Sequence, residues 1–140
     1  MSTLSYHYLE PSQVTPDGVQ LRTSGGRSAN PWFFTGFATQ PTELCAGLLA
    51  VSVVAGRNYA RGNRTFYPDP LVTADRDRLR FESMSLCAGV SARLDLLPAG
   101  LDGELHQHGT TNVDIGPELQ PLLSTVRRRD PVLLGVGAEG

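Results

Sequence analysis

The run Arg78–Leu97, RLRFESMSLCAGVSARLDLL, contains two stretches in which apolar and polar residues alternate. In the first stretch Leu79 and Phe81 share one face, and charged residues occupy the other. The second stretch, around Leu94, follows the same rule. Alternation with a period of two is typical of strands that are buried on one side only. The small-residue segment Ser85–Gly89 separates the stretches, so the run is predicted to form a β-hairpin.

The whole chain, residues 1–140, fits one domain. Its apolar fraction of 40% and charged fraction of 19% are those of a soluble globular protein. The net charge of −2 gives no overall attraction to nucleic acid or anionic lipid. No apolar stretch reaches the ~20 residues that a membrane span needs, and the first residues lack the pattern of a signal peptide. A cytoplasmic domain without membrane contact is therefore expected.

A long helix is predicted ahead of the hairpin, over about 41–59. Pro41 suits a first helical turn, and apolar residues such as Leu44 and Leu48 follow at helical spacing. Apolar residues also fill most of the remaining circumference. A helix of that kind is expected to be buried on more than one side.

The rest of the chain predicts further strands and a second helix. Leucines at helical spacing indicate a shorter C-terminal helix over about 118–128. Residues 98–103 are predicted to form a turn. Strands are predicted at 5–9, 19–23, 110–115 and 132–136. Residues 71–73 could add a short strand, and residues 32–37 form either a core strand or an aromatic anchor ahead of the helix. The sequence therefore predicts an α+β domain with a mainly antiparallel sheet of about five to seven strands.

Four of the aromatic residues lie within Trp32–Phe37. The favoured interpretation is a strand that anchors the core. The alternative is an exposed patch, on which aromatic rings stack on bases or fill a partner's pocket.

The segment Arg57–Arg80 carries six arginines against three aspartates. A solvated loop with internal ion pairs is one interpretation, and a rim that faces phosphate groups is the other. The candidate binding arginines are Arg57, Arg61, Arg64, Arg76, Arg78 and Arg80.

Candidate catalytic residues are Cys87, His106 and His108, since a cysteine activated by a nearby histidine is a common nucleophile. His106, His108 and Asp114 could together supply three metal ligands, which is the pattern of a catalytic zinc site. The alternative interpretation is that the two histidines are exposed in a loop and have no catalytic or metal-binding role. The chain has no P-loop, GxGxxG, GxSxG or HExxH motif, and no metal or other cofactor is expected. The sequence leans against an enzyme without deciding the matter.

Short polar residues gather at Thr110–Asp114. Asn112 and Asp114 could belong to a binding surface there. Equally, such side chains often bond their own backbone in turns and caps.

Several blocks together carry a family resemblance. They match, in order, the N-terminal region of bacterial SWIM zinc-finger proteins, which this chain resembles over nearly its whole length. The blocks are Thr23–Gly26, Asn30–Phe37, Gly47–Val51, Asp77–Ser83, Gly89–Asp95 and His108–Asp114.

The chain departs from that family in its cysteines. A SWIM finger is a CxC…CxH zinc site that lies downstream of this region in the family, and no CxC occurs here. Where relatives carry two adjacent cysteines, this chain has Cys87-Ala88. No zinc ligand can therefore be assigned from the resemblance.

The resemblance implies a context of protein or DNA binding, beside MoxR-type AAA ATPases and von Willebrand A-domain proteins. The first expectation is thus a non-enzymatic protein-interaction or adaptor domain. The alternative is an accessory domain that binds nucleic acid through the arginines of Arg57–Arg80, and an enzyme ranks third. The oligomeric state cannot be predicted.

Overall fold

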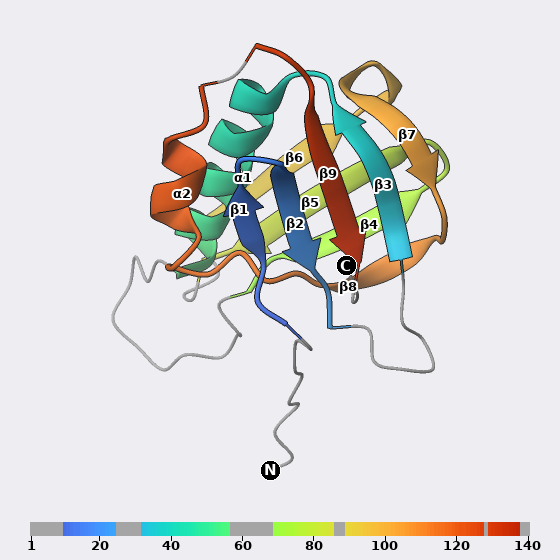
Figure 1. The fold of residues 1–140 in the computed structure, drawn as a ribbon. Coiled ribbons are helices and arrows are strands. Elements are labelled where there is room, and N and C mark those ends of the chain that lie inside the picture. The colour runs from blue at the N-terminus through green and yellow to red at the C-terminus, as the bar shows by residue number, and fades with distance from the viewer. Residues whose placement is uncertain (1–9, 25–31, 57–68, 86–88, 128, 138–140) are drawn as a thin grey trace.

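The computed structural model describes residues 10–24, 32–56, 69–85, 89–127 and 129–137. These residues form nine strands and two α-helices, in the order drawn in Figure 1. The strands are β1 (Gln13–Thr15), β2 (Gly18–Arg22), β3 (Trp32–Ala38), β4 (Leu71–Asp75), β5 (Arg78–Met84), β6 (Ser91–Leu96), β7 (Leu101–Leu105), β8 (Gly109–Asn112) and β9 (Val132–Gly137). The helices are α1 (Pro41–Gly56) and α2 (Gln120–Ser124).

The strands form two sheets. The front sheet has the order β1-β2-β9-β3-β7, and the rear sheet has the order β6-β5-β4-β8. Figure 1 shows the two sheets face to face with their strands crossing, and shows α1 and α2 closing one side. An isolated bridge between Thr23 and Val113 links the two sheets. The space between the sheets and α1 is filled by one cluster of buried apolar side chains.

The C-terminal strand β9 lies in the middle of the front sheet. It pairs in parallel with β2 and antiparallel with β3. Val132, Leu134 and Val136 point into the core, whereas Leu133 is exposed on the outer face. The register of β3 shifts between Trp32 and Phe34. Such a bulge lets consecutive residues turn to one side, and both Phe33 and Phe34 are fully buried.

Strands β3 and β7 approach each other closely at a pair of glycines. Gly36 lies opposite Gly103 in their antiparallel register. A Cβ atom on Gly103 would collide with the carbonyl oxygen of Thr35 and with the Cα of Gly36. The two strands can therefore adopt this spacing only because both positions lack a side chain.

The hairpin predicted from the sequence is the β5–β6 pair of the rear sheet. Leu79 pairs with Leu96, and Phe81 pairs with Leu94. At the connection, the N–H of Ser85 donates to the carbonyl of Val90 at 2.7 Å. The Ser85 hydroxyl in turn accepts the Val90 N–H at 3.1 Å.

Helix α1 packs against the inner face of β5 and β6 and against α2. The Ser83 hydroxyl of β5 donates to the carbonyl of Val51 at 2.7 Å. The buried Ser52 hydroxyl donates to the carbonyl of Ile115 at 2.6 Å and accepts from the side-chain amide of Gln120 at 2.8 Å. These bonds satisfy polar groups that would otherwise be costly to bury.

The α+β class, the mainly antiparallel pairing and both helices are confirmed. The described strands number nine and form two sheets, where the sequence predicted about five to seven strands in one. The segment predicted as a turn at 98–103 contains a short 3₁₀ turn at Pro98–Gly100, and β7 begins at Leu101. The regular part of α2 is shorter than the predicted 118–128. The predicted strand at 5–9 lies outside the described residues.

The close approach at the glycine pair predicts that two glycine-to-alanine substitutions differ in their effect on the free energy of unfolding. Gly103→Ala should lower the free energy of unfolding by about 1–3 kcal/mol, because the new methyl group would force β7 away from β3. Gly100→Ala is the matched control, since a Cβ atom there meets no atom within 4 Å. Urea unfolding of both variants measures the difference, and equal stabilities would contradict the close approach of the two strands.

Candidate functional site on the outer face of the rear sheet

The outer face of the rear sheet is built by the alternation that the sequence displays. Leu79 and Phe81 of β5 are fully buried in the core. Their neighbours on β5, which include Arg80 and Glu82, therefore project outward. The registers place Arg80 between Thr73 of β4 and Asp95 of β6. Polar side chains from neighbouring strands thus lie side by side across this face.

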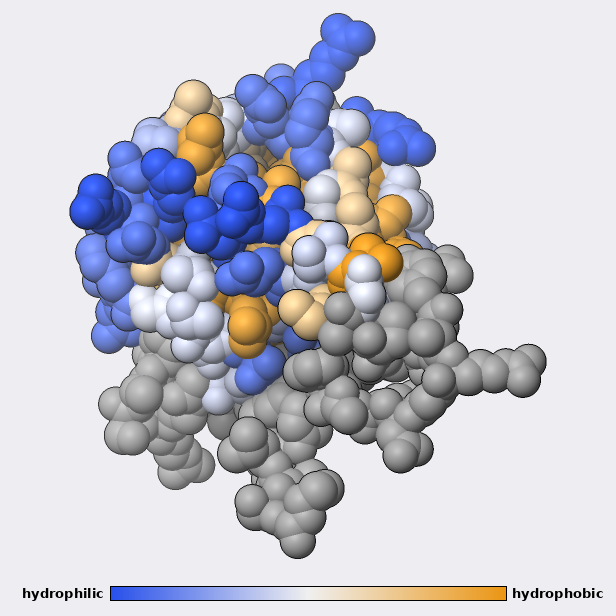
Figure 2. Space-filling model, turned by 180° about the vertical axis from the view of Figure 1, so that it is seen from behind, coloured by the Kyte–Doolittle hydropathy of each residue, from blue (hydrophilic) through white to orange (hydrophobic). Residues whose placement is uncertain are grey.

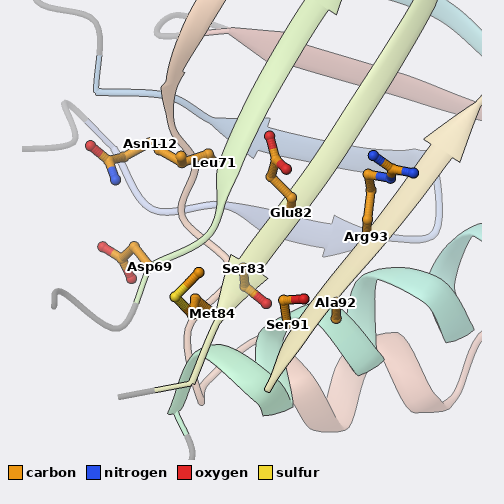
Figure 3. Close-up of a pocket in the computed structure, with 9 residues that line it drawn as sticks. All are labelled: Asp69, Leu71, Glu82, Ser83, Met84, Ser91, Ala92, Arg93 and Asn112. Carbon is orange, nitrogen blue, oxygen red and sulfur yellow. The ribbon is translucent and has the colours of Figure 1, made fainter. Parts of the chain in front are cut away.

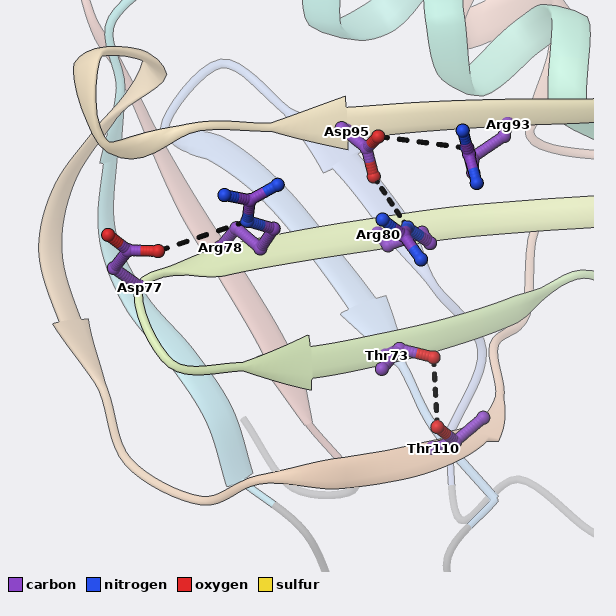
Figure 4. Close-up of polar contacts among 7 residues, drawn as sticks. All are labelled: Thr73, Asp77, Arg78, Arg80, Arg93, Asp95 and Thr110. Atoms are coloured by element: carbon purple, nitrogen blue, oxygen red, sulfur yellow. Dashed lines mark hydrogen bonds and ion pairs between the residues drawn. The ribbon is translucent and has the colours of Figure 1, made fainter.

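Ion pairs link the arginines of this face to carboxylates. Arg80 donates from Nε to Asp95 Oδ1 at 2.7 Å, and Arg93 Nε lies 3.7 Å from Asp95 Oδ2. The hydrogen bond to Asp95, aided by the charge of that carboxylate, raises the pKa of Arg80 above its usual value. Arg78 Nε lies 3.9 Å from Asp77. Figure 4 shows these contacts, in which each of the three arginines faces a neighbouring carboxylate.

A hollow of about 650 Å³ lies at one end of this face. Leu71 of β4 and Met84 of β5 line it and are 39% and 46% exposed. Glu82 and Arg93, which are cross-strand partners on β5 and β6, lie beside them (Figure 3). The other polar residues of the lining are Asp69, Ser83, Ser91 and Asn112. The hollow therefore offers apolar contact together with both signs of charge.

The surface around the hollow is mixed in character. Figure 2 shows the molecule from behind, with hydrophilic residues over most of the visible described surface and hydrophobic residues in smaller spots between them. Besides the hollow residues, Val90 is an exposed apolar residue of the rear sheet's β5–β6 connection. Surfaces of this kind are common where two proteins meet, because an interface combines apolar anchors with a polar surround.

The predicted binding arginines fall into two groups. Arg76, Arg78 and Arg80 lie on or next to the β4–β5 hairpin of this face, whereas Arg57, Arg61 and Arg64 lie outside the described residues. Arg76 is exposed at the tip of that hairpin, with Asp75 and Asp77 as its neighbours. Within the described part of this face, Arg78, Arg80 and Arg93 each lie near a carboxylate, so these arginines do not form a continuous basic patch.

The predicted polar residues separate as well. Asn112 belongs to β8 and lines the hollow, whereas Asp114 lies beyond β8 and is partly buried. The Asp114 carboxylate accepts the backbone N–H of Ser12 at 2.9 Å, and its own N–H donates to the carbonyl of Arg22. Asp114 therefore fastens the segment ahead of β1, which is the structural interpretation of this residue.

The catalytic candidates are not seen as a cluster. His106 and His108 are exposed between β7 and β8, and His106 Nε2 lies 3.1 Å from the Thr35 hydroxyl of the front sheet. Cys87 lies outside the described residues. Within the described ranges, no group of three or more His, Cys, Asp or Glu side chains is placed to hold a metal ion. The set His106, His108 and Asp114 is thus not brought together.

The aromatic segment is mainly part of the core. Phe33 and Phe34 are fully buried, and Phe37 is the exposed exception. The side chain of Trp32 is outside the described part of the structure. The core interpretation of this segment therefore holds for Phe33 and Phe34.

Sequence reasoning missed the residues that complete the face. Leu71, Glu82, Met84 and Arg93 line the hollow, and none was singled out from the sequence. The alternation of β5 and β6 already assigned Glu82 and Arg93 to the polar side of the hairpin. Only the pairing of β4 with β5 shows that Leu71 lies opposite Glu82.

Comparisons of the chain with known proteins found no match. The chain matches no known protein family, no curated protein and no solved structure. The resemblance to SWIM proteins therefore stays a prediction from the sequence blocks. None of the described helices is long and apolar enough to cross a membrane.

The hairpin tip predicts a stabilising substitution. Arg76 has a φ of 57° and is the first of the two residues between β4 and β5, a position at which glycine is favoured. Arg76→Gly should raise the free energy of unfolding by about 0.5–1 kcal/mol, because it removes the strain of a side chain at positive φ. Asp77→Gly is the control and should give no gain, since positive φ among the described non-glycine residues occurs at Arg76 alone. Thermal or urea unfolding checks both variants.

The core predicts a loss of stability at high pH. Burial raises the pKa of the Cys45 thiol from 9.0 to about 11. The unfolded chain therefore releases this proton at a lower pH than the folded chain does, so stability should fall as the pH rises from about 9 to about 11. Cys45→Ala should flatten this part of the profile. An unchanged slope in that variant would show that another group causes the loss.

Proposed function

We propose that this chain is a protein-interaction domain and that its contact surface is the outer face of the rear sheet. The observation that carries the proposal is the hollow, in which exposed Leu71 and Met84 adjoin the carboxylate of Glu82. The Glu82 carboxylate takes part in no ion pair within the described part of the chain, although its charge is one of those that raise the pKa of nearby Arg80. Apolar side chains open to solvent next to a carboxylate that has no ion-pair partner within 4 Å among the described residues are suited to a partner that supplies an apolar and a basic group.

The charge pattern favours a protein over a nucleic acid. Binding to a phosphate backbone needs a basic stripe or patch that releases counterions. Here Arg80 and Arg93 both approach the carboxylate of Asp95, and Arg78 lies next to Asp77. Phe33 and Phe34, which could have stacked on bases, are buried in the core.

The lining of the hollow indicates the chemistry of the partner. An apolar side chain would contact Leu71 and Met84, and a lysine or arginine next to it would pair with Glu82. The side-chain amide of Asn112 can add a hydrogen bond to the partner's backbone. A partner segment with adjacent apolar and basic residues therefore fits this surface.

The sequence resemblance supports a narrower version of the proposal. If the chain is a SWIM-type protein, the partner belongs to an assembly with a MoxR-type AAA ATPase or a von Willebrand A-domain protein, and the chain acts as its adaptor. This version rests on the resemblance, whereas the proposed contact surface rests on the hollow.

Two substitutions in the hollow test the proposed contact surface. Met84→Asp and Glu82→Lys should each weaken partner binding by at least about tenfold, since one buries a charge against an apolar group and the other reverses the local charge. The matched controls are Leu133→Asp and Glu104→Lys, which make the same changes at exposed positions of the front sheet. Quantitative affinity capture from native cells identifies the partner, and titration with the purified partner measures the dissociation constants.

Two results would contradict the proposal. One is a partner that binds the hollow variants as tightly as it binds the unsubstituted chain. The other is binding to single-stranded or duplex DNA that falls steeply with salt and weakens in Arg78→Ala and Arg80→Ala, which would establish the nucleic-acid function instead.

A further inference from the structure

Strand β6 forms an edge of the rear sheet. It pairs with β5 on one side, and no described strand pairs with its other side. Figure 1 shows β6 as the last strand of the rear sheet, next to α1. An edge strand presents backbone N–H and C=O groups that can pair with a further strand. Proteins often block such an edge with a proline, a bulge, a very short strand or charged side chains, and β6 carries two charges of opposite sign, Arg93 and Asp95. Strand β6 has six residues, no proline and no shift of register.

The hydrogen bonding of the hairpin decides which backbone groups face the free edge. The N–H of Ser85 donates to the carbonyl of Val90, so these two residues form a hydrogen-bonded pair. Hydrogen-bonded and non-hydrogen-bonded pairs alternate along an antiparallel ladder. The pair Phe81–Leu94 is therefore hydrogen-bonded, and Leu94 directs its backbone groups toward β5. Arg93 and Asp95 consequently direct theirs toward the free edge.

We propose that two copies of this chain associate through antiparallel pairing of their β6 strands, with Leu94 opposite the second copy's Leu94. In this register Arg93 lies opposite the second copy's Asp95, and Asp95 lies opposite its Arg93. Each of these two pairs is a hydrogen-bonded pair of the new ladder, because both residues direct their backbone groups to the free edge. The interface is self-complementary, as two-fold symmetry requires.

The charges of β6 distinguish this register from its neighbours. Both strands must keep their polar residues on the outer face. A shift of the register by one residue would move every side chain to the opposite face, so the nearest alternative registers are those shifted by two residues. One such step places Arg93 opposite Arg93, and the opposite step places Asp95 opposite Asp95. Like charges directly opposite each other destabilise a strand pair, and opposite charges stabilise it. The Leu94-centred register is the one of the three that pairs opposite charges twice.

Helix α1 provides a surface on which an added strand can lie. Gly47 of α1 lies against Leu94, since a Cβ atom at Gly47 would stand 2.7 Å from Leu94 Cδ1. The neighbouring Ala46 and Ala50 are exposed, and Glu43 is the one charged residue of this helix. A helix that is apolar on all sides is typically covered on all sides. In the proposed dimer the inward side chains of the second β6 approach this exposed part of α1.

The dimer has a consequence for the outer face. A two-fold axis through Leu94 of both strands is perpendicular to the sheet, so the outer faces of both copies lie on the same side. The two four-stranded sheets become one sheet of eight strands, with a hollow on each half. The inference is independent of the proposed function, because it concerns self-association of the purified chain alone.

Sedimentation equilibrium of the purified full chain at several concentrations tests the proposal. The unsubstituted chain should be a dimer that dissociates on dilution. Arg93→Glu should raise the dissociation constant at least about tenfold, because it places two glutamates opposite the aspartates. Arg78→Glu is the matched control, with the same change of charge on β5 of the same face, and should leave the dimer intact.

A second variant separates loss of the dimer from loss of the fold. Arg93→Pro removes an N–H that faces the free edge, so it should block pairing while leaving the β5–β6 ladder in place. Its circular dichroism spectrum should match that of the unsubstituted chain, and it should unfold cooperatively on heating, as a folded monomer does. A chain that stays monomeric up to about 1 mM, or an Arg93→Glu variant that dimerises as the unsubstituted chain does, would overturn the proposal.

Cross-linking tests the register itself, in a Cys87→Ser background. Opposed residues of a non-hydrogen-bonded pair have Cα atoms about 4.5 Å apart, which a disulfide can bridge. Leu94→Cys should therefore give a disulfide-linked dimer under mild oxidation. Ala92→Cys should not, because position 92 lies opposite Leu96 of the second copy in this register. Cross-linking at 92 without cross-linking at 94 would overturn the register.

Discussion

Burial of helix α1 against the inner face of β5 and β6 is the constraint on which the rest of the structure depends. The helix carries apolar residues on nearly all sides, and seven of its residues are buried. Two serine hydroxyls hold it in place, because Ser83 bonds to the carbonyl of Val51 and Ser52 bonds to that of Ile115. Directed bonds in an apolar interior fix an orientation that apolar contact alone leaves open. The inner face of β5 and β6 is thereby committed to the core.

That commitment determines the character of the outer face. With Leu79 and Phe81 directed inward, the alternation of the strand places the charged residues of β5 outward. Neighbouring strands then bring Asp95 within reach of both Arg80 and Arg93. Ion pairs that stay partly open to solvent, as these do, contribute little to stability. Their effect is on the charge pattern of the surface, because they place Arg80 and Arg93 beside a carboxylate and leave the hollow next to Glu82 as its distinctive feature.

Some elements could be predicted because their signals are local. The β5–β6 hairpin follows from alternation within one segment, and α1 follows from Pro41 and the apolar spacing behind it. Strand β7 was missed because Pro98 and two glycines, Gly100 and Gly103, indicate a turn. Gly103 is instead the residue that lets β7 approach β3. A glycine required for close contact between strands has the same local appearance as a glycine required for a turn.

The sequence by itself determined the class of the fold, the two helices and the polar side of the hairpin. Each of these depends on the periodicity of neighbouring residues, which chain geometry converts directly into faces. Only the tertiary structure decided that the strands divide into two sheets, that β9 lies in the centre of the front sheet, and that Leu71 lies beside Glu82. These features depend on pairing between segments far apart in the chain. Such pairing is chosen by the packing of the whole core, and no local pattern records it.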